Sequence, residues 1–251
     1  MKKIILSLAM IAAMAALAVG ATTAYFSDTE TSEGNTFTAG AIDLKIDSNC
    51  SYNGVSSDEC GVWDETDLGA TNYKFFNFSD LKPGDQGENT ISYHVYNNDA
   101  YMCVYITDMH DDDLGLTEPE QEDGDYTDGA DNGELAQELH FFAWADDGDN
   151  IWECGEDTLF SNIEGPASDI LDGRVYPLYT PNTGALSGDS TGYIGIYWCY
   201  GNLIVNQQNC TLSCDGSAVN NVSQTDSLTA NISFYAEQAR HNENFTCPSI
   251  K

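Results

Sequence analysis

Apolar and polar residues alternate in several short stretches of the chain, and this period of two is typical of half-buried β-strands. The clearest stretches are 191–200 and 227–238, where every second residue is apolar over most of the length. Residues 91–96 and 101–109 alternate in the same way and are separated by the polar turn 97–99, so we expect them to form a hairpin. In all, the pattern predicts strands at 74–78, 91–96, 101–109, 141–145, 174–179, 191–200 and 227–238.

The stretches between these strands are polar, rich in glycine and without an apolar period. Residues 110–133 are mostly acidic and are expected to form a long surface loop, and 134–139 has the composition of one or two helical turns. In Leu81-Lys82-Pro83-Gly84-Asp85, proline followed by glycine favours a type II turn, because glycine accepts the positive φ at its third position. The chain is therefore predicted to be an all-β sandwich with long acidic loops and short helical turns.

The first 24 residues have the parts of a secretory signal peptide. Lys2 and Lys3 precede an apolar run at 4–19, and small residues then lead to a cleavage site after Ala24, so that Tyr25 begins the mature chain. The alternative is a retained membrane anchor, but the run has only 16 residues, fewer than the roughly 20 that a spanning helix needs. We therefore expect a secreted protein without a stable membrane anchor after cleavage.

Residues 25–46 follow the signal peptide directly, and the two halves of this segment differ in their pattern of apolar residues. The first half is polar and has no apolar period, whereas Phe37 and Ala39 share one parity and Ile42 and Leu44 share the other. A change of face near Gly40 is typical of a bulge or a sharp bend between two short strands. Such a segment can add a strand to an open sheet edge, in its own subunit or in another.

The charge of the chain is strongly negative, with 41 acidic against 8 basic residues and a formal net charge of −33. This excess argues against nucleic acid and anionic membranes as partners, because both repel a negative surface. Divalent cations, a salty medium and simple solubility are all compatible with it. The charge itself does not choose among these three.

Two acidic loops are candidate calcium sites, because closely spaced carboxylates and glycines can deliver the six to eight oxygen ligands that calcium takes. Neither loop matches the EF-hand pattern, and a solvated acidic loop remains the alternative. The first set is Asp123, Asp125, Asp128, Asp131 and Glu134, and the second is Asp146, Asp147, Asp149, Glu153 and Glu156. Calcium is the one cofactor that the sequence suggests.

Cysteine usage agrees with export. An even number of cysteines behind a signal peptide indicates disulfides in an oxidising compartment, and the pairs closest in sequence are Cys50–Cys60 and Cys210–Cys214. A zinc site is disfavoured, since there is no C-x-x-C pair and the four histidines lack ligand spacing. The disulfide candidates are Cys50, Cys60, Cys103, Cys154, Cys199, Cys210, Cys214 and Cys247.

Six N-x-[ST] sequons are candidate glycosylation sites in an exported protein, although such triplets also arise by chance in chains rich in Asn, Ser and Thr. They lie at Asn49, Asn77, Asn209, Asn221, Asn231 and Asn244.

Sequence motifs near both ends of the mature chain resemble the TasA/camelysin family. The N-terminal motifs are AYFSDTE at 24–30, NTFTAG at 35–40 and Ile42-Asp43-Leu44, followed by the LKPGD turn at 81–85. The C-terminal motifs are YWCYG at 197–201, QTDS at 224–227, FYAEQAR at 234–240 and NFTC at 244–247. Residues 111–172 carry no motif of this family.

The resemblance implies a jelly-roll subunit that is exported by a dedicated signal peptidase. Members include biofilm fibre proteins of bacteria and bundling pilins of archaea, in which the N-terminal strand of one subunit completes the sheet of the next. On this basis we expect a signal peptide at 1–24, a donor segment at 25–46 and a jelly-roll domain at 47–251 with an acidic, loop-rich insertion at about 110–172. Candidate polymerisation residues are Tyr25, Phe26, Phe37, Ile42 and Leu44.

The expected function is therefore a secreted fibre or bundling-pilus subunit of the extracellular matrix or cell surface, with copies of itself as partners. The first alternative is a camelysin-like surface metallopeptidase, because relatives of that type are described as peptidases. The HExxH motif of common zinc peptidases is absent, so no catalytic residue is assigned. The second alternative is a calcium-binding surface adhesin.

Overall fold

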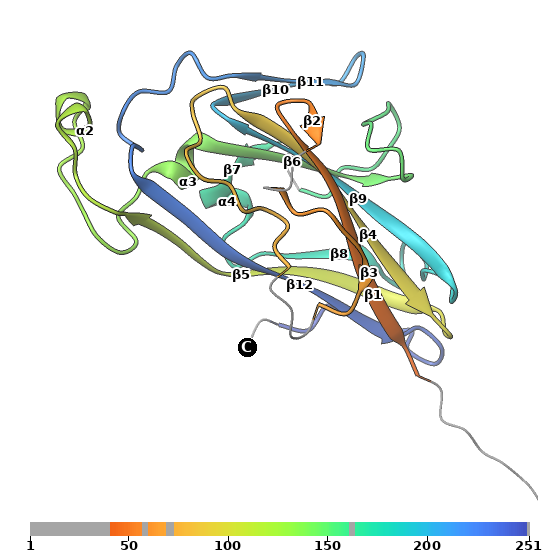
Figure 1. The fold of residues 1–251 in the computed structure, drawn as a ribbon. Coiled ribbons are helices and arrows are strands. Elements are labelled where there is room, and N and C mark those ends of the chain that lie inside the picture. Colours follow the sequence, from red (N-terminus) through yellow and green to blue (C-terminus); the bar gives the residue numbers. More distant parts are fainter. Residues whose placement is uncertain (1–40, 57–59, 69–72, 161–163, 250–251) are drawn as a thin grey trace, which may run out of the picture. The chain divides into compact units, whose positions relative to one another are not determined.

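The alternating stretches form two antiparallel sheets that enclose a common core (Figure 1). The computed structural model describes residues 41–56, 60–68, 73–160 and 164–249. In this part of the chain, the larger sheet has the strand order β2-β1-β4-β9-β6-β7, and β3 pairs with the side of β1 opposite β4. Its strands are β1 (Asp43–Tyr52), β2 (Val55–Ser56), β3 (Trp63–Thr66), β4 (Gln86–Tyr96), β6 (Leu139–Asp146), β7 (Gly165–Pro166) and β9 (Ser190–Tyr200).

The smaller sheet has the order β12-β5-β8, and a separate hairpin is formed by β10 and β11. The short helices α2, α3 and α4 lie in the connections. The strands are β5 (Ala100–Asp113), β8 (Val175–Tyr179), β10 (Asn202–Asn206), β11 (Thr211–Asp215) and β12 (Asp226–Gln238), and the helices are α2 (Glu118–Asp123), α3 (Leu135–Glu138) and α4 (Ala167–Ile170). The described chain is thus the predicted all-β sandwich with short helical turns.

The core lies between the two sheets and is built by the predicted apolar parities. Ile91 and Val95 of β4 are buried against Met102 and Val104 of β5, and the indole of Trp198 from β9 closes one end. These side chains belong to the same alternating sets that the sequence assigns to one face, because successive residues of a strand point to opposite sides of the sheet. Burial of this face is what holds the two sheets together.

The expected hairpin of 91–96 and 101–109 is wrong. β4 pairs with β1 and β9, whereas β5 pairs with β12 and β8, so the chain passes from the larger to the smaller sheet at the turn after Tyr96. Both strands turn an apolar face toward the core. These faces are buried equally well whether the two strands are neighbours in one sheet or lie in two sheets packed face to face. The polar turn at 97–99 does not distinguish these arrangements.

Residues 74–78 are not a strand, although their aromatic composition predicts one. The ring of Phe75 lies 6.1 Å from that of Phe234 in β12, and the ring of Phe78 lies 4.8 Å from Trp198 in β9. The segment thus fills the space between the sheets with side chains, and the Phe75 carbonyl accepts a hydrogen bond from the buried Asn89 side chain. Its apolar residues serve the core without pairing in a ladder.

A second cluster of apolar side chains covers the outer face of β6 and β9. Phe142 and Trp144 of β6 are fully buried there, together with Trp152 and Leu203. Because β6 is buried on both faces, its sequence is a continuous apolar run instead of an alternating one. The interval 110–172, expected as a loop-rich insertion, therefore contains the end of β5, the whole of β6 and β7, and the short helices α2, α3 and α4.

Two glycines are required by the local geometry, and the first, Gly84, has the role that the sequence predicts for it. Gly84 has φ +90°, and the amide of Asp85 donates to the Lys82 carbonyl at 2.9 Å, which closes the type II turn. A Cβ at Gly195 would lie 2.1 Å from the Trp144 ring. Only glycine therefore lets β9 pass beneath this buried indole.

Four disulfides join all eight cysteines. Cys50–Cys60 forms as predicted, but Cys210 pairs with Cys154 and Cys214 pairs with Cys199. The local pair 210–214 is wrong because the two residues are separated along β11, and four residues of extended chain span roughly 13 Å, more than a disulfide allows. The remaining bridge joins Cys103 of β5 to Cys247.

The predicted N-terminal segment divides at the start of β1. Leu44 lies opposite Val95 of β4 in its own subunit, and Ile42 packs against the core of the same subunit. Leu44, predicted as a polymerisation residue, is therefore corrected to a self-paired position, because β1 pairs with β4 from Asp43 onward; Ile42 precedes the strand and only packs against the core. The signal peptide, its cleavage site after Ala24, and Tyr25, Phe26 and Phe37 lie outside the described residues.

Within the described part of the chain, no helix has the length and apolar character needed to cross a membrane. The asparagines of all six sequons are exposed, including Asn231 on the outer side of β12. Their positions are compatible with glycosylation, which stays a prediction.

Candidate metal centre

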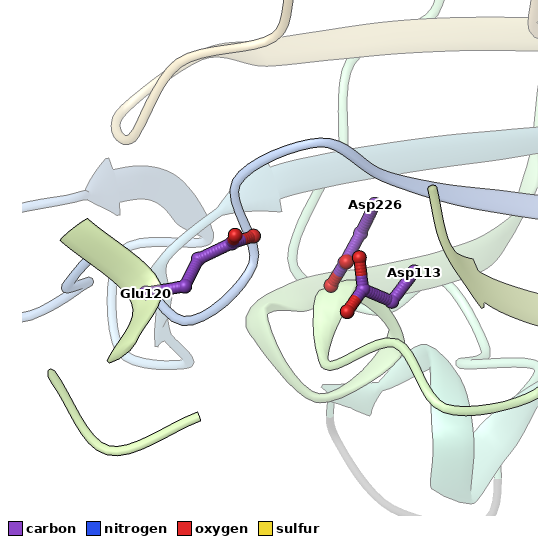
Figure 2. A group of neighbouring side chains, drawn as sticks. All are labelled: Asp113, Glu120 and Asp226. Atoms are coloured by element: carbon purple, nitrogen blue, oxygen red, sulfur yellow. The ribbon is translucent and has the colours of Figure 1, made fainter. Parts of the chain in front are cut away.

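Three carboxylates converge where β5 ends, β12 begins and α2 lies against them. Asp113, Glu120 and Asp226 each bring one oxygen to within 4.8 Å of the other two, and Figure 2 shows their carboxyl groups turned toward one another. Asp113 is 3% exposed and Glu120 is 0% exposed. We call these three residues the acidic cluster.

The register of β5 and β12 places two of the three. Asp113 is the last residue of β5, Asp226 is the first of β12, and the two lie directly opposite each other in the ladder. Like charges at directly opposed positions destabilise a sheet pair. This pair is therefore unfavourable unless a positive charge or a proton accompanies it.

The third residue is placed by α2, which the sequence did not predict. Thr117 and Glu120 form a capping box, in which the Thr117 amide donates to Glu120 Oε2. Gly124 ends the helix with φ +107°, and its amide donates to the Glu120 carbonyl at 2.9 Å. The helix is held at both ends, so the Glu120 side chain is fixed with its second oxygen free.

In each carboxylate of the cluster, one oxygen is bound by backbone amides and the other has no hydrogen-bond partner. Asp113 Oδ1 accepts from the Gly115 amide at 2.8 Å, and Asp226 Oδ2 accepts from the amides of Glu134 at 2.7 Å and Leu135 at 3.1 Å. The buried oxygens Asp113 Oδ2, Glu120 Oε1 and Asp226 Oδ1 are unpaired. Backbone bonds that orient one oxygen and leave the other free are the arrangement expected of metal-ligating carboxylates.

Three further carboxylates, those of Asp111, Asp125 and Glu134, flank the cluster, and the first two repeat this arrangement. Asp125 Oδ1 accepts from the amide and the hydroxyl of Thr127, both at 2.9 Å, and Asp111 Oδ2 accepts from the Ala136 amide at 2.8 Å. Asp111 Oδ1, Asp125 Oδ2 and Glu134 Oε2 are buried and unpaired. With the acidic cluster, six carboxylate oxygens in this region thus lack a partner.

The pKa values of Glu134 and Asp226 are raised, which means that their ionised forms are destabilised in this region. Burial, followed by the nearby charges of Asp125 and Asp226, raises the pKa of Glu134 to about 7. Burial is also the largest cause that raises the pKa of Asp226 to about 6, with Asp111 and Asp113 adding to it against opposing amide bonds. The region therefore holds more negative charge than it can stabilise by itself.

A second group of carboxylates lies in the loop after β6. Asp147, Glu153 and Glu156 bring oxygens to within 4.8 Å of one another, but Asp147 and Glu153 are exposed. We call residues 146–157 the β6 loop. Burial raises the pKa of Glu156, and Cys154 in the same loop is joined to Cys210.

The predicted calcium residues are divided between these two places. Of the first set, Asp125 and Glu134 lie beside the acidic cluster, whereas Asp123 accepts hydrogen bonds from Asn221 and Asp131 pairs with His110 at 2.8 Å. Asp128 is exposed. In the second set, Asp147, Glu153 and Glu156 meet, and Asp146 is bonded to the Trp144 indole and to the amides of Gly148 and Asn150. Asp149 is exposed and accepts from the Ile151 amide.

The central residues Asp113, Glu120 and Asp226 were not predicted. Asp113 and Asp226 come from strand ends far apart in the sequence, and only the β5–β12 register brings them together. One signal was present for Glu120: the order Thr117-Glu118-Pro119-Glu120 is a capping-box sequence with proline at the start of a helix.

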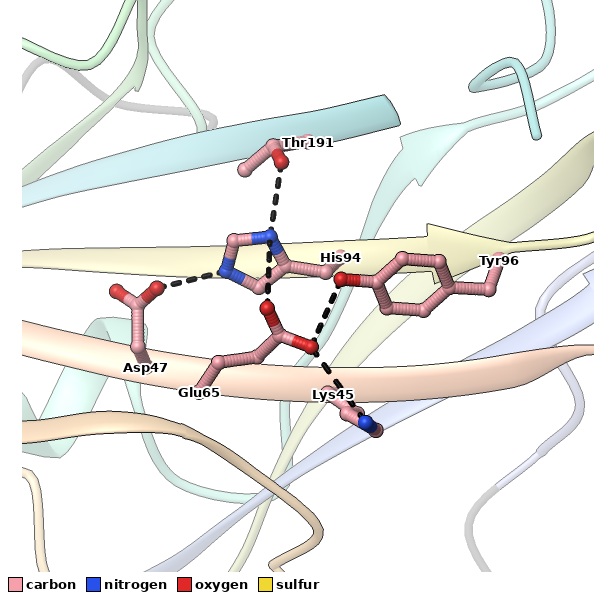
Figure 3. A network of polar contacts seen from close by, with 6 residues as sticks. All are labelled: Lys45, Asp47, Glu65, His94, Tyr96 and Thr191. Atoms are coloured by element: carbon pink, nitrogen blue, oxygen red, sulfur yellow. Dashed lines mark hydrogen bonds and ion pairs between the residues drawn. The ribbon is translucent and has the colours of Figure 1, made fainter. Parts of the chain in front are cut away.

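A polar network on the larger sheet contains the only hydroxyl–histidine–carboxylate chain that we find in the described residues (Figure 3). His94 bonds to Asp47 at 2.6 Å and to the Thr191 hydroxyl at 2.8 Å. Both ring nitrogens are thus occupied by residues of β1 and β9, so His94 is not the solvated residue that its strand position suggests. Thr191 lies within β9, directly opposite His94 of β4 in the ladder, so the network links β1, β4 and β9.

The chain also contains the spacing Gly-x-Ser-x-Gly at 188–192. In hydrolases this motif forms a sharp turn between a strand and a helix, but here Ser190 begins β9 and its hydroxyl donates to the Ser187 carbonyl. The motif here is therefore the start of a strand and does not form the strand-to-helix turn of a hydrolase.

The fold and its centres define a disulfide-bonded, all-β sandwich whose candidate metal ligands are carboxylates. A family model described as camelysin metallo-endopeptidase matches residues 1–243, which is nearly the whole chain. The protein belongs to this family, the TasA/camelysin family, as the terminal motifs predicted. No curated protein matches the chain.

Proposed function

We propose that the protein is a secreted structural subunit of an extracellular fibre or bundling pilus, and that the segment before β1 supplies a strand to the next subunit. In this scheme a dedicated signal peptidase removes residues 1–24, and the freed end enters the sandwich of a neighbour on the cell surface or in the matrix. Copies of the same chain are then its partners.

One observation carries this proposal: β12 is an edge strand in the described structure. It has 13 residues and pairs with β5 on one side. β8, the other edge of the smaller sheet, has five residues and contains Pro177, which cannot donate to a ladder. A long edge without proline is a template for strand addition, so we assign the incoming segment to β12.

The start of β1 limits which residues can be donated. Because β1 is paired with β4 from Asp43 to Tyr52, the donor is confined to residues between the cleavage site and Ile42. Tyr25, Phe26 and Phe37 are its large apolar side chains. The donor is thus shorter than the segment 25–46 that the sequence suggested.

The energies favour association. Six to ten new backbone hydrogen bonds contribute about 1 kcal/mol each, and burial of Phe37 adds about 1.5–3 kcal/mol. Donor and acceptor occupy different places on one subunit, so the contact is heterologous and propagates into a filament instead of closing into a dimer.

Deletion of 25–34 from the mature protein tests the proposal. We expect a folded protein with an unchanged far-ultraviolet circular dichroism spectrum that stays monomeric, whereas the intact mature protein forms fibres in negative-stain electron microscopy. A matched pair sharpens the test: Phe37→Asp should prevent fibres, and Ser32→Asp, which adds the same charge to a polar position, should affect them less. Fibres from the deleted protein would exclude strand donation by this segment.

The family description favours one second candidate, a metallo-endopeptidase. In the described residues, both carboxylate groups able to hold a metal lack histidine, and His94, His110 and His140 each pair with a carboxylate at a different place. Casein cleavage by the purified protein that stops on addition of a chelator, and returns with metal, would favour this candidate. Fibres without cleavage would favour the structural one.

A further inference from the structure

We infer that a calcium ion binds between β5, β12 and α2, with Asp113, Glu120 and Asp226 as its protein ligands. This site is separate from the N-terminal segment and does not depend on the proposed role in fibres. It lies outside the two loop sets that the spacing of acidic residues suggested, although Asp125 and Glu134 of the first set lie beside it.

Burial together with missing partners distinguishes this cluster from ordinary surface acids. Glu120 is 0% exposed and Asp113 is 3% exposed; each has an oxygen without a hydrogen-bond partner, and each brings an oxygen to within 4.8 Å of the other carboxylates of the cluster. An unpaired buried carboxylate oxygen is costly, and buried charges are normally paired or coordinate a metal. The described residues provide neither a lysine nor an arginine at these oxygens.

The arrangement of the backbone favours a cation over rearrangement of the side chains. The amides of Gly115, Thr117 and Glu134 each hold one oxygen of a different member of the cluster. Rotation of any carboxylate to relieve repulsion would break such a bond. The three free oxygens are therefore held facing one another, and a positive ion between them removes the repulsion without moving the backbone.

The donor set selects calcium among the common cations. Every candidate ligand is a carboxylate oxygen, whereas zinc prefers nitrogen and sulfur. The three clustered oxygens are the protein ligands, and water molecules can complete the six to eight oxygens that calcium takes; the unpaired oxygens of Asp111, Asp125 and Glu134 add negative charge nearby. The protein ligands come from two strands and a helix, and this mixed origin suits calcium better than the strict octahedron of magnesium.

A pocket lined by residues 123–127, Glu134 and Val222 adjoins the site, because it contains the flanking residues Asp125 and Glu134. Tyr126, another residue of its lining, is 74% exposed. A hydrated ion can therefore meet these two carboxylates at the surface of the protein. Once bound, it joins α2 and the adjoining loop to the first residue of the edge strand β12.

Calorimetric titration of the mature, disulfide-intact protein with calcium chloride, after dialysis against a chelator, tests the inference. We expect saturable binding of calcium and an increase in melting temperature that tenfold more magnesium does not reproduce. The double variant Asp113→Asn with Glu120→Gln should lose one equivalent of calcium or bind it at least tenfold more weakly. Glu118→Gln with Glu122→Gln, which removes the same charge from the exposed side of α2, should bind calcium as the parent does.

Glu120→Gln alone keeps an oxygen acceptor for the Thr117 amide and replaces the double variant if that protein does not fold. The inference is overturned if the parent protein shows neither heat nor a change in melting temperature with calcium. It is also overturned if the cluster variants bind calcium unchanged, which would assign the ion to the β6 loop. Equal effects of magnesium and calcium would overturn the choice of ion.

Discussion

The acidic cluster and the β6 loop each contain three carboxylates that approach one another, yet their surroundings differ. In the cluster, Asp113 and Glu120 are buried, and each has one oxygen bonded to an amide and one unpaired. In the β6 loop, Glu156 also has one oxygen bonded to an amide and one that is buried and unpaired, but Asp147 and Glu153 are exposed to water, which screens their charges. The two regions therefore differ in how many of their carboxylates are buried, and we place the metal site where two of the three are buried.

The two regions also differ in what restrains them. The β6 loop is attached covalently, because Cys154 is joined to Cys210 in the turn between β10 and β11. The segment around α2 contains no cysteine, and we assign the same role there to the bound ion. An acidic loop can thus be held by a covalent bond or by a cation, and the following experiments separate the two.

The largest effect is expected from removal of the Cys154–Cys210 disulfide. The two residues are 56 positions apart, so loss of this bridge in Cys154→Ala with Cys210→Ala should lower the free energy of unfolding by about 4 kcal/mol through the entropy of the unfolded chain. Chemical denaturation measures this change. Calcium affinity should be unchanged, and a parallel loss of calcium binding would show that the ion sits in the β6 loop.

Removal of calcium should have the next largest effect on stability, and this effect should be confined to the segment around the acidic cluster. At a free calcium concentration 100 times the Kd, binding stabilises the bound state by about 2.7 kcal/mol. Addition of a chelator should therefore speed proteolytic cleavage within 114–134 by up to about a hundredfold. Mass spectrometry of the fragments measures this, with cleavage within 147–157 as the internal reference; equal acceleration of both would contradict the comparison.

Two glycines provide a matched pair with a smaller effect. Gly124 after α2 has φ +107° and Gly155 in the β6 loop has φ +120°, and a Cβ at either meets no atom within 4 Å. Alanine should cost about 1 kcal/mol at each position, because both need a left-handed backbone. Only Gly124→Ala should weaken calcium binding, since it alters the helix that carries Glu120, and calorimetry distinguishes the two.

The smallest effect is expected for Glu156→Gln in the β6 loop. The site is only half-buried, and a surface substitution of this kind changes stability by less than about 0.5 kcal/mol. The melting temperature in calcium should stay within about one degree of the parent protein's value. A clear decrease would mean that the β6 loop also holds an ion.

The strands were predictable because their signal is local. β9 and β12 alternate within themselves, and the Pro83-Gly84 turn carries its own conformational preference, so no knowledge of the rest of the chain was needed. Pairing between strands is not local. The sequence places β4 beside β5, whereas the structure places them in different sheets, since either arrangement buries the same apolar faces.

The candidate site shows the same limit. Asp125 and Glu134 could be selected because they lie in a visibly acidic stretch, but Asp113 and Asp226 are single acids at strand ends, and their approach depends on the register between β5 and β12. Among the disulfides, Cys50–Cys60 could be predicted because the two residues are close in sequence. Cys154–Cys210 could not, because it depends on how the β10–β11 hairpin packs on β6. Properties created by long-range pairing need the fold.

The bridge between Cys103 and Cys247 has a consequence for resistance to proteolysis. It encloses 144 positions of the chain, including the exposed acidic stretches that proteases attack most readily. A single cut anywhere in that span leaves the two fragments covalently joined and their sheets still packed. The protein should therefore tolerate nicking in a protease-rich medium, and reduction should be needed before the cleaved pieces separate.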